Sequence, residues 1–390
     1  MGASREGILI PVFLARVYLN KFKMMKEHVR IIVLLVLLIT ISCNNSWDKS
    51  IESVKFPKEY TIEGEKFNLD EYYDFNMISV VDTFLLIGAE RADKNLFHAF
   101  NARTGDMIGE IISRGRGPCE VVSAAIVPQT DVDETGILHI FDINMYSLLE
   151  IDLSQLILNP GYSCRREIVE VPVSSGPVTS IMYMGKDVIL FENDRSRFSI
   201  YNRNTGEIIF IPYQSGSLSY NLKKENEKHL FYSGGLCFNS DLKRIVSAPY
   251  SVGQLDFYEF SGEHRSTVVF GEYGEIVKNI KDFNSEIVPS LMSLNLYTFN
   301  LFSDNKFIYV ITTDPVLKRG SIMEYGTDFS NCRTLLLIFD WDGNAVKKIA
   351  FDRFLMQTGM DLKEKTIYGL APSPNNGLEM YKYSLGLNEE

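Results

Sequence analysis

The chain contains few of the residues that usually form catalytic and metal centres. Its 390 residues include 2 tryptophans, 5 histidines and 5 cysteines. Four histidines lie far apart, and no two of them have the spacing of zinc ligands: His98, His139, His229 and His264. The chain also lacks a P-loop, a G-x-S-x-G elbow and an H-E-x-x-H motif. These absences favour a non-catalytic protein, for which we expect no cofactor and no metal ion.

Basic residues are also too few and too dispersed to bind nucleic acid. The chain has 39 Lys and Arg against 50 Asp and Glu, and its formal net charge is −11. Nucleic-acid binding needs a basic patch or stripe, commonly interleaved with aromatic side chains, and the sequence shows none. We therefore expect no nucleic-acid partner.

The cysteines do not form a recognisable motif. Cys119, Cys164, Cys237 and Cys332 are scattered, and no C-x-x-C occurs, which argues against zinc and thioredoxin-like sites. An exported compartment would permit disulfides. The wide spacing leaves buried free thiols as an equal alternative.

The longest apolar run lies near the N-terminus and is typical of an export signal. A basic segment ending at Arg30 precedes Ile31–Ile41, which is too short to span a bilayer comfortably. Ser42 followed by Cys43 resembles a bacterial lipobox, although Thr40 stands where Leu is usual. The alternatives are an ordinary signal peptide or an uncut signal anchor. We predict that Cys43 is lipidated.

This signal divides the chain into four parts. Residues 1–23 are expected to be a mis-called start or disordered, 24–42 a lipoprotein signal peptide, 43–58 a tether and 59–386 the folded domain. The predicted location is the bacterial cell envelope, at the periplasmic or the surface face of the outer membrane. The acidic body would not be drawn to anionic lipid, so attachment would depend on the acyl chains of Cys43.

After the tether the chain is dominated by strand-like apolar runs separated by turn residues. Examples are Ile78–Gly88, Phe307–Thr312 and Thr334–Phe339. Only Asn279–Ser293 and Arg353–Leu362 have a weak helical period. The chain is therefore predicted to be nearly all-β, with one helical insertion.

A short pattern, an aromatic residue and Asp or Asn followed by Gly, recurs between these runs. It occurs at Phe100–Gly105 and Tyr201–Gly206, and in tighter forms at Phe260–Gly262 and Phe339–Asn344. Gly and Asn supply the positive φ angles that β-hairpin turns need. The recurrence predicts a repeat architecture built of hairpins.

The length of the domain indicates how many repeats it holds. A four-stranded propeller blade takes about 40–50 residues plus loops. The folded domain then suits a six-bladed β-propeller best, with seven blades as the alternative. Tyr213–Ser233 and Gly271–Ser303 are predicted to be insertions, and loops on one face of a propeller usually form its binding surface.

One loop resembles a known family. Gly115, Gly117, Pro118 and Glu120 form a G-x-G-P-x-E loop, and a strand of apolar residues ending in Asp142 follows it. This arrangement is similar to the TolB-like six-bladed β-propeller lipoproteins of Bacteroidetes. The resemblance implies their fold and compartment, but no catalytic residues. Cys119 departs from the Gly that the family usually carries there.

Three segments could bind a ligand or ion. Arg114, Arg116 and Glu120 form a possible ligand-binding loop, because Arg can hold an anion with two hydrogen bonds. Alternating carboxylates at Asp131–Gly136 and Asp340–Asn344 suggest calcium, but both segments are typical turns between strands.

These features favour a lipid-anchored envelope propeller that binds a protein or glycan partner without catalysis. The alternative is a metal-dependent propeller hydrolase or lyase, whose site in the central channel would combine single residues from several blades. A third possibility is an assembly component of an outer-membrane complex.

Overall fold

The computed structural model divides the chain into two units, Met1–Ile51 and Glu52–Glu390. The structure describes these parts of the second unit: residues 53–69, 75–89, 95–127, 136–159, 161–170, 178–184, 188–213, 228–285, 291–324, 327–373 and 377–387. Residues 1–52, which include the predicted signal and Cys43, lie outside them. Among the described residues, no helix is long and apolar enough to cross a bilayer.

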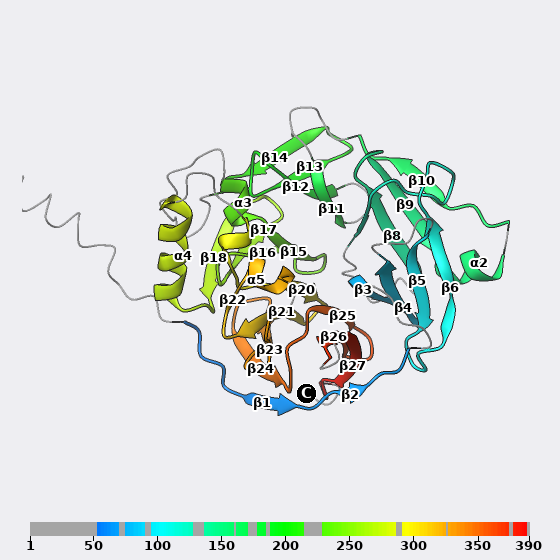
Figure 1. Ribbon diagram of the computed structural model, residues 1–390. Helices are drawn as coiled ribbons and strands as arrows, with labels where there is room; N and C mark the ends of the chain where they lie inside the picture. Colours follow the sequence, from blue (N-terminus) through cyan, green and yellow to red (C-terminus); the bar gives the residue numbers. More distant parts are fainter. Residues whose placement is uncertain are drawn as a thin grey trace, which may run out of the picture. The chain divides into compact units, whose positions relative to one another are not determined.

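The second unit is a six-bladed β-propeller (Figure 1). Blades 1 to 3 each contain four consecutive antiparallel strands. Blade 1 consists of β3 (Phe75–Val81), β4 (Phe84–Ala89), β5 (Asn95–Asn101) and β6 (Met107–Ser113). Blade 2 consists of β7 (Ala124–Ile126), β8 (Ile137–Asp142), β9 (Ser147–Asp152) and β10 (Arg165–Ile168). Blade 3 consists of β11 (Val178–Met184), β12 (Val188–Asn193), β13 (Phe198–Asn202) and β14 (Glu207–Ile211).

Blades 4 to 6 complete the ring, and the last two take strands from the start of the chain. Blade 4 consists of β15 (Gly234–Asn239), β16 (Arg244–Pro249), β17 (Gln254–Glu259) and β18 (His264–Val269). Blade 5 consists of β20 (Asn300–Ser303), β21 (Phe307–Asp314), β23 (Arg333–Asp340), β24 (Ala345–Phe351) and the parallel strand β1 (Glu59–Ile62). Blade 6 consists of β25 (Gln357–Asp361), β26 (Thr366–Pro372), β27 (Leu378–Ser384) and β2 (Glu65–Lys66).

The ring is therefore closed by the N-terminal part of the domain. β2 supplies the outer strand of blade 6 by pairing with β27, with Glu65 opposite Lys382. Before β1, the described part of the predicted tether already contacts the propeller. The amide of Val54 donates to the carbonyl of Val269 at 2.8 Å, and the rings of Phe56 and Phe339 meet edge to face.

The core consists of the interfaces between neighbouring blades. On β4, Leu85 and Ile87 pack against blade 6, while Leu86 packs against blade 2. On β21, Ile308 and Val310 face blade 4, and the alternate residues face blade 6. Both faces of these strands are buried, which explains their nearly continuous apolar runs. Each fully buried side chain contributes about 1.5–3 kcal/mol.

The recurring hairpin pattern marks the turn between the third and fourth strands of a blade. It occupies this position in blades 1, 3, 4 and 5, where its glycines have φ angles of +83°, +71°, +83° and +86°: Gly105, Gly206, Gly262 and Gly343. In the first of these turns, Asn101 Oδ1 accepts the amides of Arg103 and Thr104 at 2.9 and 3.2 Å. Asn202 repeats this geometry.

Blades 2 and 6 lack the pattern for different reasons. In blade 2, α2 (Leu153–Leu158) separates the third and fourth strands, and in blade 6 the fourth strand comes from the N-terminus. The prediction of six blades is thus confirmed.

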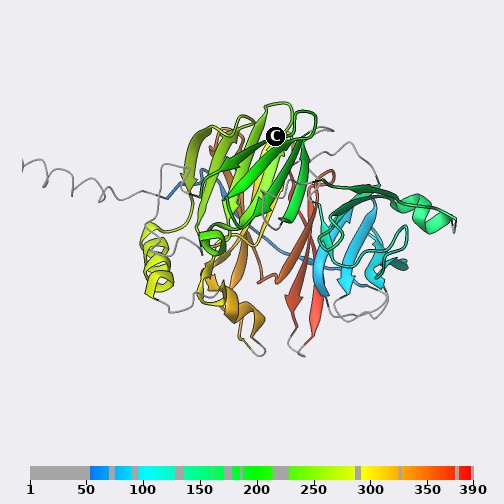
Figure 2. The same ribbon diagram turned by 90° about the horizontal axis from the view of Figure 1, so that it is seen from above.

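Antiparallel strands alternate in direction, so the turns of every blade divide between two faces. The turns that follow the first and third strands lie on one, here called the hairpin face. The turns after second strands and the connections between blades lie on the other, here called the insertion face. The insertion face carries α3 (Lys228–Tyr232), α4 (Tyr273–Ser285), η3 (Leu291–Ser293), β19 (Asn295–Leu296), β22 (Leu317–Lys318) and α5 (Arg319–Met323). In Figure 2, α4 and α5 (yellow-green and gold) lie in the lower part of the view.

Two helical predictions need correction. α4 begins six residues before Asn279, because Ile276, Ile280 and Phe283 form its buried stripe. Arg353–Leu362 is not a helix. It contains the inner strand β25, in which Thr358 and Met360 are both buried. Ile78–Gly88 likewise spans two strands, with a turn at Asp82, whose φ is +52°.

Candidate functional site

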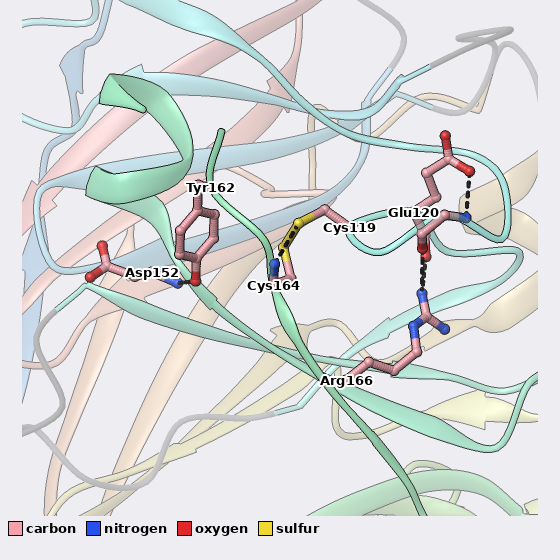
Figure 3. The surroundings of a disulfide bond; sticks show 7 residues. Cys119, Glu120, Asp152, Tyr162, Cys164 and Arg166 are labelled. Atoms are coloured by element: carbon pink, nitrogen blue, oxygen red, sulfur yellow. Dashed lines mark hydrogen bonds between the residues drawn. A yellow bond between two sulfur atoms is a disulfide. The ribbon is translucent and has the colours of Figure 1, made fainter. Parts of the chain in front are cut away.

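The G-x-G-P-x-E loop joins blade 1 to blade 2 on the insertion face and is held together by its own glutamate (Figure 3). Glu120 Oε2 accepts the amide of Gly117 at 2.7 Å. A Cβ atom at Gly115 would lie 2.0 Å from the same oxygen, so only glycine leaves room for the folded-back carboxylate. In this structure the carboxylate of Glu120 therefore stabilises the loop itself.

Asp142 and Arg166 attach this loop to blade 2. Asp142 is fully buried, and its two carboxylate oxygens accept the amides of Val122 and Asn144 at 2.8 and 3.2 Å. Arg166 donates to Ser147 Oγ at 2.8 Å and also to the carbonyl of Glu120. The residues that match the family pattern therefore form a joint between two blades.

A disulfide reinforces the same joint. Cys119 pairs with Cys164, which lies just before β10, and their Cα atoms are 5.2 Å apart (Figure 3). This bond explains why Cys replaces the usual Gly in the loop. Cys237 and Cys332 are free thiols. Of the two alternatives left open by the sequence, the disulfide applies to Cys119 and Cys164 and the buried free thiol applies to Cys237, whereas Cys332 is a half-buried free thiol.

Arg114 and Arg116 are both exposed on this loop. Arg114 forms an isolated backbone bridge with Val121. Neither arginine lines the cavities described below. Their role in binding a ligand stays a prediction.

A different part of the insertion face contains two adjoining cavities, at the mouth of the central channel. The channel cavity, of about 320 Å³, lies against the inner strands of blades 3, 4 and 5 and includes Glu192 and Gly234. The side cavity, of about 250 Å³, lies between blades 5 and 6 and α5 and includes Arg319. Tyr250 and Asn300 line both.

Close packing of the inner strands shapes the channel cavity. A Cβ at Gly234 would lie 2.1 Å from the carbonyl oxygen of Ala248, and one at Gly235 would lie 2.8 Å from Leu301 Cβ. The glycine pair therefore lets β15 approach both β16 and β20. Asn300 Nδ2 donates to the backbone carbonyl and the hydroxyl of Thr358 at 2.9 and 2.8 Å, which fixes the boundary between blades 5 and 6.

Opposite charges act on Tyr250 from the two cavities. Burial raises the pKa of Tyr250, the charge of Glu192 raises it further, and Arg319 lowers it. The Arg319 guanidinium lies 5.9 Å from the centre of the Tyr250 ring. The pKa of Glu192 is also raised, to about 7, because the effect of burial outweighs that of a hydrogen bond from the Gly234 backbone, which lowers it. Glu192 therefore changes charge near neutral pH.

The structure describes one of the two segments that the sequence suggested for calcium, and the carboxylate of Asp340 in it has other partners. Asp340 Oδ1 accepts the amides of Asp342 and Asn344 at 2.9 and 2.8 Å, as a turn residue does. Asp131–Thr135 lies outside the described residues. Within the described ranges, no three His, Cys, Asp or Glu side chains gather closely enough to hold a metal ion.

Comparison with known proteins assigns the family. The profile described as "TolB-like 6-blade propeller-like" matches residues 62–365. The chain belongs to this TolB-like propeller family. The resemblance seen in the G-x-G-P-x-E loop is thereby confirmed. No curated protein matches the chain.

The chain is also similar to solved structures. A member of the DUF4221 family from Bacteroides vulgatus is 13% identical, with a TM-score of 0.50, covering 85% of this chain and 97% of that chain. A protein from Bacteroides fragilis described as exported is 10% identical, with a TM-score of 0.47, covering 84% and 99%. At 13% identity, the first of these shows a shared fold and nothing about a ligand.

The sequence alone did not reveal the residues at the channel mouth of this TolB-like chain. Glu192, Tyr250 and Arg319 come from β12, from the turn after β16 and from α5, and no motif links them. The one available signal was Gly234-Gly235 at the start of a strand, since glycine in a strand often marks a close approach of the backbone.

Proposed function

We propose that the protein is a lipid-anchored propeller of the cell envelope that binds a protein or glycan partner without catalysing a reaction. The observation that carries the binding role is the pair of adjoining cavities on the insertion face. Binding sites are typically concave, largely apolar and supplied with a few polar groups, as these are. The basic, apolar and Ser-Cys segments that end at Cys43 support export and anchoring.

The binding role can be tested by cross-linking in cells. A photoreactive amino acid at Met292, which is 47% exposed in η3, should give a covalent adduct with the partner. Leu242 is the matched control, because it is 46% exposed in a turn on the hairpin face. An adduct formed equally from both positions would contradict a binding role for the insertion face. Turnover of lactones, esters or glycans by the purified protein would contradict the non-catalytic part.

Replacing Cys43 by Ala should abolish membrane attachment. Without the thiol no acyl chains can be added, and the acidic protein has no other affinity for anionic lipid. Fractionation followed by immunoblotting should move the protein from the membrane to the soluble fraction. Cys332→Ala, which removes a free thiol in the propeller, should leave it in the membrane fraction. A Cys43→Ala variant that still sediments with membranes would show that lipidation is not the anchor.

A further inference from the structure

The side cavity has the chemistry of a site for one negative charge on an apolar body. Apolar side chains supply much of its wall: Leu296, Phe299, Ile322, Leu355 and Met356. Among the residues that the structure describes, Arg319 is the single charged residue in the wall and no acidic residue lines it. An apolar ligand bearing one anionic group would match both properties.

The guanidinium of Arg319 is available for such a ligand. It stacks over Tyr250 but makes no ion pair or side-chain hydrogen bond with the residues that the structure describes. Other arginines of the domain have carboxylate partners, for example Arg333 with Asp314 and Arg353 with Asp352. A half-buried guanidinium with unused donors is suited to bind a carboxylate by donating two parallel hydrogen bonds to it.

A second polar group in the same wall lacks a partner. Thr298 is completely buried, and its hydroxyl has no hydrogen-bond partner within the described part of the chain. Buried polar groups are normally satisfied, so the Thr298 hydroxyl can take a further hydrogen-bond partner. Thr298 and Arg319 both line the side cavity.

We propose that the side cavity binds the carboxylate of an apolar C-terminal residue of a protein partner, with Arg319 as its anchor. This inference deepens the proposed binding function and rests on it. A polyhydroxylated sugar acid would need more polar partners than this wall offers. A phosphate would leave the apolar wall unused. The cavity, at about 250 Å³, has room for one such residue and not for a long chain.

The test compares an acid with its amide on the full chain purified in neutral detergent. N-acetylphenylalanine should bind in isothermal titration calorimetry, and N-acetylphenylalanine amide should bind at least about tenfold more weakly, because charged hydrogen bonds are the stronger ones. A hexapeptide ending in Phe with a free C-terminus separates the two sources of carboxylate. Tighter binding of the peptide than of the free acid would support a chain end as the ligand, and weaker binding would indicate a small acid and overturn the inference.

Arg319→Gln should weaken binding of the acid at least about tenfold while leaving weak binding of the amide unchanged. Arg103→Gln, which changes an arginine that is 74% exposed in a turn on the hairpin face, should bind the acid as the unaltered protein does. Equal binding of acid and amide, no binding of the acid, or normal binding by Arg319→Gln would overturn the inference. Thermal melting of each variant separates misfolding from loss of the anchor. Should the Met292 adduct persist when no acid binds, the carboxylate site would be wrong and the proposed function would stand.

Discussion

Replacing Arg197 by Met is expected to lower the free energy of unfolding by about 3–5 kcal/mol, since it leaves a buried carboxylate unpaired. Arg197 lies in the turn after β12, and its side chain is 1% exposed where it pairs with the fully buried Asp256 of β17. It also donates to Ser247 Oγ at 3.0 Å. The ion pair therefore joins blades 3 and 4, and its loss would weaken the interface between them.

The effect of Arg197→Met should depend on pH. Burial alone would raise the pKa of Asp256, but the charge of Arg197 and hydrogen bonds from His264, Thr267 and Gln254 hold it below its usual value. The carboxylate thus stabilises the native protein above the unfolded-state pKa, and this contribution is lost as the pH falls through the lower folded-state pKa. Without Arg197 the carboxyl can protonate more readily, so the loss of stability should shrink toward pH 4.

Urea unfolding followed by circular dichroism at pH 7 and pH 4 measures both effects. Arg333→Met is the control, because it breaks a half-exposed pair with Asp314 and should cost less than about 1 kcal/mol. A loss below about 1 kcal/mol for Arg197→Met at pH 7 would show that the buried pair is not needed between blades 3 and 4.

Glu192→Gln should make the protein more stable at alkaline pH, by up to about 3.5 kcal/mol. Burial raises the pKa of Glu192 from 4.5 to about 7, and each pKa unit corresponds to about 1.4 kcal/mol. Below pH 4.5 the side chain is protonated in the folded and the unfolded chain. As the pH rises through 7, the folded protein must accept a buried charge, and stability is lost. Gln carries no charge and avoids this loss.

Unfolding at pH 4.5 and pH 8.5 tests this second expectation. The gain from Glu192→Gln should appear at pH 8.5 and vanish at pH 4.5. Glu207→Gln on the exposed part of β14 is the control and should change stability little at either pH. An equal gain at both pH values would mean that packing, and not ionisation, distinguishes Gln from Glu at this position.

The scaffold could be predicted because its signals are local. Asn101 and Gly105 shape a turn through contacts within a few residues, so their chemistry is visible in the sequence itself. The weak helical period at Arg353–Leu362 is misleading, because this segment packs as a strand against blade 1: a Cβ at Gly359 would lie 2.6 Å from Ile78 Cγ2.

The site could not be predicted because its parts are distant along the chain. Glu192, Tyr250 and Arg319 meet only when the inner ends of separate blades converge on the channel. Glu120 shows the opposite difficulty. Its place in an Arg-rich loop suggests a ligand contact, but no sequence pattern shows that its carboxylate turns back to the amide of Gly117.

The closing strand also sets an order for folding. During synthesis β2 emerges early and its partner β27 emerges late, because Glu65 pairs with Lys382. Blade 6 cannot be completed until β27 is available, and β2 stays unpaired until then. Unpaired strands promote aggregation, so the chain is most exposed to misassembly just before these two strands pair.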